Sequence, residues 1–300
     1  MAIVWDSPRA LEVTGFVYKQ LIVFLLGFYI WEFLNTLWFE WDLITRKIAF
    51  RWYYVSYLIG RYSMLVVLCL LFIIDRNKGM PIDCELVHPL LTTIGLIAST
   101  CATTNLMIRT VIIWDYKKLI AAPLTAMALG QLIFSVYGGV TYAKAFWDEE
   151  LKTCRFNYSH YSHLAIAFIY TVTYDLTILI LTCLRIMRSN TRSRLWSALR
   201  DQGLLYFVFT AIVNIIAAVF IMLHLNDGMN AVVSPPATTI SVILSGQSVI
   251  SLMQLNKSGA NTSHAGGQSQ YQRSKSQEFT SHLDFPTFVD ALDSFFGNYN

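Results

Sequence analysis

Seven polar side chains that could ionise or form strong hydrogen bonds lie inside long apolar runs of this 300-residue chain. They are two acids, two bases and three carboxamides: Glu32, Arg61, Asn105, Arg109, Asp175, Asn214 and Gln247. Burying such groups in hydrocarbon is costly, so they are functional candidates by default. Acids and bases at one depth favour ion pairing, and a buried pair suits a switch between two packings. The alternative is that these groups only fix which helices are neighbours, through interhelical hydrogen bonds.

Four histidines gather toward the opposite ends of these apolar runs: His88, His160, His163 and His224. The three-residue spacing of His160 and His163 could present both imidazoles together. Four histidines at one level could bind zinc or respond to pH. The alternative is that they are polar aromatic side chains at a membrane interface. Because no carboxylate or thiolate stands at a fixed spacing from them, the sequence predicts neither a metal site nor a cofactor.

The elements that hold these residues are long apolar helices. A helix rises about 1.5 Å per residue and has to cross about 30 Å of hydrocarbon, which takes about 20 residues. Windows of this kind lie at 16–38, 52–75, 88–114, 119–142, 162–184, 203–225 and 232–254. With 55% hydrophobic and 14% charged residues, the chain has too little polar surface to coat a soluble globule. The sequence predicts an all-α, seven-transmembrane helix bundle in a lipid bilayer.

The basic residues predict the orientation of this bundle. One set of alternate loops holds thirteen Lys and Arg side chains and the other set holds six. Basic residues resist translocation, so the richer side faces the cytoplasm. The protein is expected in the plasma membrane with its N-terminus outside and its C-terminus in the cytoplasm. The richer side carries Arg46, Lys47, Arg51, Lys117, Lys118, Arg185, Arg188, Arg192, Arg194, Arg200, Lys257, Arg273 and Lys275.

Two features of the predicted outer loops agree with this orientation. Cys84 and Cys154 are the only cysteines in loops, and both loops are expected on the oxidising side, which predicts a disulfide between them. Unpaired surface thiols are the alternative. Asn157 begins an Asn-Tyr-Ser glycosylation sequon in the same loop as Cys154.

The membrane domain, residues 16–255, is flanked by segments of different composition. Residues 1–15 form a short external N-terminus, and 256–281 are rich in Ser, Gln, Gly and Asn, as in a disordered cytoplasmic linker. Apolar residues recur at helical spacing in 282–300, which predicts a short amphipathic helix. The basic loop 185–202 predicts an amphipathic segment that lies at the headgroups or docks a cytoplasmic protein. Pro235 and Pro236 predict the start of the seventh span.

Several motifs together resemble those of a large family of basidiomycete fungal membrane proteins whose N-terminal third is a domain of unknown function. The likeness extends from about residue 16 to 255. It implies a heptahelical protein with an external N-terminus and no established ligand, and the topology looks receptor-like. The motifs are Tyr29-Ile30-Trp31-Glu32-Phe33, Phe39-Glu40-Trp41, Arg51-Trp52, Gly60-Arg61-Tyr62, Asn105-Leu106-Met107-Ile108-Arg109, Ile113-Trp114, Tyr174-Asp175-Leu176, Ser193-Arg194-Leu195-Trp196 and Asp201-Gln202-Gly203-Leu204-Leu205-Tyr206-Phe207.

Two functions fit these patterns. The first is a receptor-like sensor of a small molecule or lipid that reports to a cytoplasmic signalling protein through 185–202 or 282–300. The second is a transporter or proton-coupled carrier that uses Glu32 and Asp175. No hydrolase elbow, paired-histidine zinc motif or phosphate loop stands in the spans, so an enzyme is not expected. The net charge of +3 follows from the loop asymmetry and does not indicate nucleic-acid binding.

Overall fold

The computed structural model describes residues 8–45, 53–76, 83–142, 145–148, 153–156, 161–188, 194–222 and 227–264. The chain divides into two compact units, Met1–Leu252 and Met253–Asn300. Residues 253–264, the end of the last helix, are the described part of the second unit. The fold and the sites below belong to the first unit.

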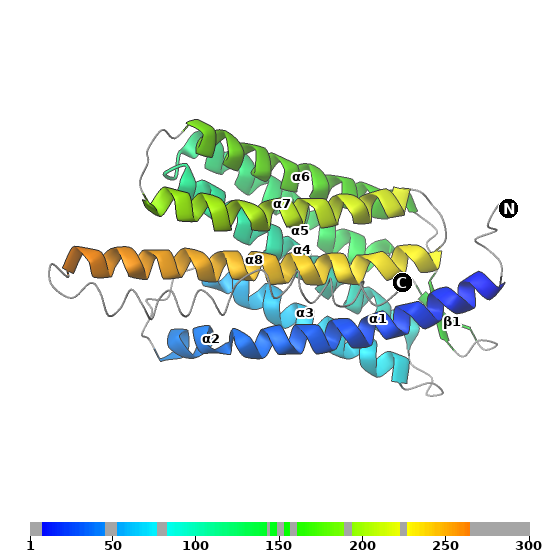
Figure 1. Cartoon of the computed structure of the whole chain (residues 1–300). Coiled ribbons are helices and arrows are strands. Elements are labelled where there is room, and N and C mark those ends of the chain that lie inside the picture. Colours follow the sequence, from blue (N-terminus) through cyan, green and yellow to red (C-terminus); the bar gives the residue numbers. More distant parts are fainter. Residues whose placement is uncertain are drawn as a thin grey trace, which may run out of the picture. The chain divides into compact units, whose positions relative to one another are not determined.

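The described chain is almost entirely helical, and its helices form a bundle (Figure 1). Each of the seven predicted windows falls on a long helix, because continuous apolar runs satisfy their own backbone hydrogen bonds best in this form. A short helix, α2, follows α1 after a single residue. The helices are α1 (Pro8–Asn35), α2 (Leu37–Ile44), α3 (Tyr53–Arg76), α4 (Cys84–Ile113), α5 (Lys118–Tyr142), α6 (Tyr161–Arg188), α7 (Arg194–Met222) and α8 (Asp227–His264).

Helix α4 lies at the centre of the bundle and packs against α3, α5 and α6, and α6 packs against α7. Its residues 105–110 are all buried. One apolar core cluster joins Tyr29 of α1, Met64 of α3, Ala98 of α4 and Val242 of α8. Neighbouring helices therefore bury a continuous interface around α4, which sets the positions of the polar residues that follow.

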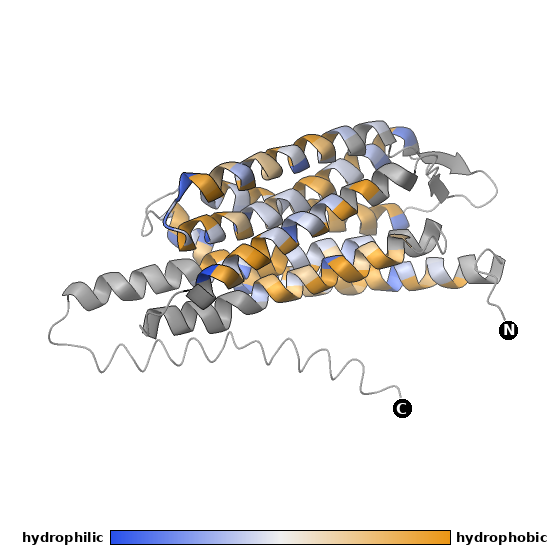
Figure 2. Cartoon of the chain, turned by 90° about the horizontal axis from the view of Figure 1, so that it is seen from above, coloured by the Kyte–Doolittle hydropathy of each residue, from blue (hydrophilic) through white to orange (hydrophobic). Residues whose placement is uncertain are grey.

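The distribution of polarity suits a hydrocarbon solvent. Large apolar side chains face outward, among them Phe16, Trp31 and Ile133, which are 62%, 56% and 70% exposed. Many Thr, Ser, Asn and Gln side chains are buried instead. Figure 2 shows the corresponding predominance of hydrophobic residues along the helices. A water-soluble bundle would not expose so many large apolar side chains.

Four helical segments in the described ranges are long and apolar enough to cross a membrane: Val13–Asn35, Tyr53–Arg76, Glu85–Ile113 and Lys118–Tyr137. Tyr206–Phe220 is apolar but shorter. The chain thus has the apolar helices of a membrane-embedded protein. That all seven windows cross the bilayer, and in which direction, stays a prediction.

A small hairpin departs from the all-α expectation. Strands β1 (Ala145–Asp148) and β2 (Thr153–Phe156) pair antiparallel, with Trp147 opposite Cys154. Short runs that contain aromatic residues and Thr favour strands when a turn joins them. Strand β1 packs against α4, so the hairpin belongs to the bundle.

Two helix boundaries differ from those expected. Helix α8 begins at Asp227, so Pro235 and Pro236 lie inside it and do not start it. It also continues to His264, so the segment 256–281 begins as helix, because extending an established helix costs little. Residues 185–188 and 194–202 of the basic loop belong to α6 and α7. Residues 1–7, 189–193 and 265–300, with the predicted helix at 282–300, lie outside the described residues.

Candidate functional site: a polar network around α8

The first apolar run is interrupted at Thr36, between α1 and α2. The Thr36 hydroxyl donates to the Glu32 carbonyl at 2.8 Å and lies 3.4 Å from the Phe33 carbonyl. A threonine that bonds back to the preceding turn competes with the helical ladder and often bends a helix. The interruption places Glu32 of α1 and Glu40 of α2 on its two sides.

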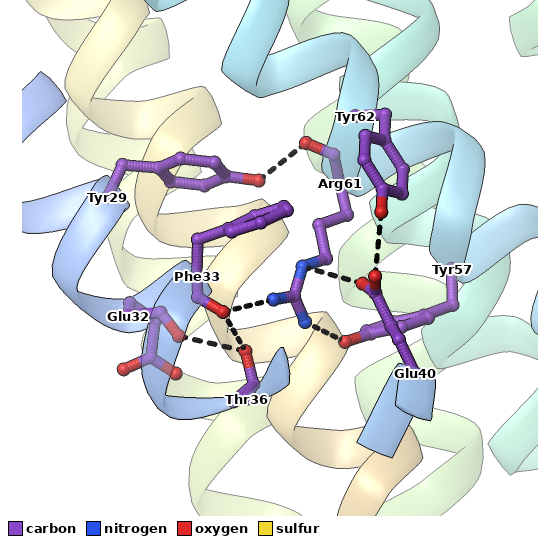
Figure 3. A network of polar contacts seen from close by, with 8 residues as sticks. All are labelled: Tyr29, Glu32, Phe33, Thr36, Glu40, Tyr57, Arg61 and Tyr62. Atoms are coloured by element: carbon purple, nitrogen blue, oxygen red, sulfur yellow. Dashed lines mark hydrogen bonds and ion pairs between the residues drawn. The ribbon is translucent and has the colours of Figure 1, made fainter. Parts of the chain in front are cut away.

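Arg61 of α3 lies against this interruption (Figure 3). Its guanidinium donates to the Phe33 carbonyl and to the Tyr57 hydroxyl, and Nε lies 3.1 Å from Glu40 Oε1. The guanidinium carbon is also 4.2 Å from the centroid of the Phe33 ring. A planar, permanently charged fork of donors can make all these contacts at once, whereas a lysine could not.

Glu40 is held from both sides. Its Oε1 faces Arg61, and its Oε2 accepts a hydrogen bond from Tyr62 at 2.7 Å. Tyr29 of α1 donates to the Arg61 carbonyl at 2.8 Å, which ties α1 to α3 at the same level. The Arg61 and Glu40 side chains are 7% and 6% exposed, so their pair is almost completely withdrawn from solvent.

Glu32 pairs with a neutral partner, since Gln247 of α8 donates to its Oε1. Glu32 lines the same cavity as Arg61, but the ion pair of Arg61 is with Glu40. The expectation that the singled-out acids and bases pair with one another was therefore wrong for Arg61. The physical reason is the interruption at Thr36, which brings Glu40 back toward α3.

Arg109 of α4 has no acidic partner among the described residues. Its Nη1 donates to the Ser248 hydroxyl at 2.6 Å and to the Ser248 carbonyl at 3.1 Å. Its Nε and Nη2 are buried without a hydrogen-bond partner, and so is Oδ1 of Asn105, one turn earlier. This cation is 2% exposed and is neutralised by no carboxylate within the described helices.

Asp175 of α6 forms a third group. Asn214 of α7 donates to Asp175 Oδ2 at 2.6 Å, and Ser241 of α8 donates to Asn214 Oδ1 at 3.3 Å. Asp175 Oδ1 is buried without a partner in the described structure. The sequence placed Asp175 and Asn214 at one depth, and the structure brings them together.

All three groups reach α8 through different residues. Gln247 contacts α1, Ser248 contacts α4, and Ser241 contacts α7. The seven predicted residues therefore form three separate groups on one helix rather than a single cluster. A rotation or translation of α8 would change the contacts of all three groups together.

Two small cavities adjoin these groups. Glu32, Arg61, Asn105 and Gln247 line the first. Tyr53, Asn105, Ile108, Arg109, Ser248 and Val249 line the second. Asn105 borders both, and its amide oxygen is buried without a hydrogen-bond partner. Each is of water-molecule size rather than of drug size.

The structure describes only some of the histidines, cysteines and the sequon that the sequence places toward the outer side. His88 is half-buried on α4, whereas His160, His224 and the His163 side chain lie outside the described residues. No group of metal-ligating side chains occurs in the described ranges. The side chains of Cys84 and Cys154, as well as Asn157, are likewise outside what the structure describes, and Cys69, Cys101 and Cys183 are free thiols. The disulfide and the glycosylation stay predictions.

Several contact residues were missed by reasoning from the sequence. Glu40 lies just beyond the predicted first span, and Tyr57 stands one helical turn before Arg61. A tyrosine at that spacing from a buried arginine was a usable signal. No such signal marks Ser241 and Ser248 in the sequence. Serine is common in apolar helices, and its role is seen only from the side chains that surround it in the fold.

Comparison with protein-family models finds no match, and neither does comparison with curated protein sequences.

Proposed function

We propose that the chain is a seven-helix integral membrane protein of the plasma membrane that acts as a receptor-like sensor, with its N-terminus outside. Its ligand is a small molecule or lipid, and its cytoplasmic partner is a signalling protein that docks at 185–202 or 282–300. The resemblance to the basidiomycete heptahelical family is part of this proposal. The observation that carries it is a single buried cation, Arg61, that pairs with Glu40 on one side of a helix interruption and shares a cavity wall with Glu32 on the other side.

The two carboxylates offer Arg61 two alternative pairings. In the described state Arg61 pairs with Glu40, and Gln247 donates a hydrogen bond to Glu32. If Gln247 withdraws with α8, Glu32 loses its partner and becomes the better acceptor for Arg61. Both arrangements keep the Arg61 cation paired, whereas intermediate arrangements do not. An uncompensated buried charge is strongly unfavourable, so the intermediates are sparsely populated. Such a two-state element is what a sensor needs to convert ligand binding into a change of packing.

The switch is tested by measuring the separation of α2 and α3. Spin labels introduced as unnatural amino acids at Trp41 and Ile59, which are 65% and 45% exposed, report this separation in nanodiscs. Glu40→Gln should shift the distance distribution, because Arg61 then pairs with Glu32. Glu32→Gln should leave the distribution unchanged, and Tyr62→Phe is the matched control that keeps both carboxylates. An unchanged distribution in Glu40→Gln contradicts the switch.

The signalling step is tested separately. Purified protein is mixed with heterotrimeric G-protein α subunits, and nucleotide exchange is followed across a broad ligand screen. Stimulus-dependent exchange that Glu40→Gln makes independent of ligand is the expected result. The absence of any stimulated exchange counts against this type of coupling.

A carrier is the second candidate, and Asp175 is the observation that favours it. This buried carboxyl group has one oxygen without a partner in the described helices and no cation beside it. Such a group can take up and release a proton as its surroundings change. A carrier of this kind loses proton or substrate flux in proteoliposomes when Asp175 is replaced by Asn. Unchanged flux rules out Asp175 as the carrier group.

A further inference from the structure

The positive charge of Arg109 has no counter-charge among the described residues, and the proposed sensor mechanism gives Arg109 no role. Its guanidinium is permanently protonated and 2% exposed, and the described residues supply it with no carboxylate. Its two hydrogen bonds come from Nη1 alone and go to neutral oxygen atoms of Ser248. A neutral hydroxyl and a carbonyl offset only part of the cost of burying the charge.

Arg109 also borders a cavity. Nε and Nη2 are buried without a partner, and the guanidinium shares the cavity wall with Asn105, Ser248 and Tyr53. The amide of Asn105 also has a buried atom without a partner, and oxygen and nitrogen of such an amide exchange places by a simple flip. The wall therefore offers up to three kinds of donor: guanidinium N–H, amide N–H and the Ser248 hydroxyl, whose oxygen already accepts from Arg109.

The size of the cavity restricts its occupant. It has room for about one water-sized particle, so a phosphate, a sulfate or a lipid headgroup does not fit beside the side chains. A single water could satisfy one or two donors but would leave the positive charge uncompensated. A monatomic anion satisfies the donors and the charge at once.

We propose that Asn105, Arg109 and Ser248 form a binding site for one small monovalent anion of the size of chloride, between α4 and α8. The anion accepts hydrogen bonds from Arg109 Nε or Nη2 and neutralises the guanidinium. Because Ser248 follows Gln247 directly on α8, the bound anion also stabilises the described position of that helix. The anion contacts neither Arg61 nor its carboxylates, so either proposal can fail alone.

The test uses the full-length chain purified in nanodiscs. The midpoint of thermal unfolding is measured as sodium chloride replaces sodium gluconate at constant ionic strength. A ligand that binds only the folded state raises stability with its concentration in a saturable way. The expected result is a saturable rise with chloride and none with sulfate. The same midpoint in chloride and gluconate overturns the proposal and leaves water as the occupant.

Three variants separate the site from general effects of salt. Arg109→Gln should weaken chloride binding by about tenfold or more, since it removes the charged donors. This variant could fail to fold, and Asn105→Asp covers that case. Its carboxylate, one turn from Arg109 on the wall of the same cavity, replaces the anion, so the protein should fold and lose its chloride response. A full chloride response in folded Asn105→Asp overturns the proposal.

Arg185→Gln is the control, because Arg185 lies on α6, does not line the cavity, and pairs with the exposed Asp115 at 2.9 Å. It should keep the full chloride response. Line broadening of the ³⁵Cl magnetic resonance signal supplies a direct measurement of binding. Broadening by the wild type that disappears in Asn105→Asp is expected, and equal broadening by both proteins contradicts the site.

Discussion

Arg61 of α3 and Glu40 of α2 form a buried ion pair with an Nε–Oε1 separation of 3.1 Å, across an interruption in the first apolar run. The pair connects α2 to α3, and through the Phe33 carbonyl it also connects α1.

Replacing Glu40 by Gln should lower the free energy of unfolding by about 1–3 kcal/mol, because Arg61 loses its paired charge and keeps Glu32 nearby. The double variant Glu32→Gln/Glu40→Gln should cost more than the sum of the two single variants, since no acid then remains for Arg61. Unfolding by SDS titration in mixed micelles measures these values. Tyr62→Phe removes one hydrogen bond only and should cost less. Strict additivity of the two glutamate substitutions would contradict the shared cation.

Gly60→Ala should destabilise the contact between α3 and α4. A Cβ at Gly60 would lie 2.9 Å from Cys101 Cβ, closer than real carbon atoms approach, so the helices must move apart. We expect a loss of about 1–3 kcal/mol in the same titration. Gly27→Ala is the matched control, because a Cβ there meets nothing within 4 Å and alanine favours a helix. Equal effects at the two positions would show that helix propensity, not packing, decides the result.

Tyr116→Gly should raise the free energy of unfolding by about 1 kcal/mol. Tyr116 has a φ of 54°, a left-handed conformation that costs a non-glycine residue about that amount. Its neighbour Lys117 does not share this conformation, so Lys117→Gly should be neutral or destabilising. Thermal unfolding of both variants measures the difference. A loss of stability in Tyr116→Gly would mean that the exposed side chain matters more than the backbone.

Cys84 and Cys154 should be joined by a disulfide in protein purified without reductant. Helix α4 begins at Cys84 and packs against β1, and Trp147 of β1 lies opposite Cys154 of β2. The hairpin that carries Cys154 therefore contacts the helix that begins at Cys84. Peptide mapping by mass spectrometry with and without reductant should detect the linked pair. Cys84→Ser and Cys154→Ser should lower thermal stability equally, and a larger effect of one would argue for free thiols.

Particular residues show why the sequence predicted the helices better than their contacts. Continuous apolar windows identify helices because hydrocarbon requires local backbone hydrogen bonds, and the window at 52–75 matches α3 to within one residue at each end. Asp175 and Asn214 were expected at one depth, but the hydrogen bond between them is a finding of the structure. Arg61 was assigned to the correct depth but not to Glu40, because polarity along a helix says nothing about an interruption at Thr36.

By itself, the sequence determined that the chain forms long apolar helices and which polar side chains they bury, because both properties depend on local composition and on the solvent. It did not determine which buried group meets which. The tertiary structure decided that Arg61 faces Glu40, that Arg109 faces Ser248, and that α8 contacts all three polar groups. These contacts depend on helix rotation and spacing. Close packing at residues such as Gly60 sets both of them, and a one-dimensional pattern does not record them.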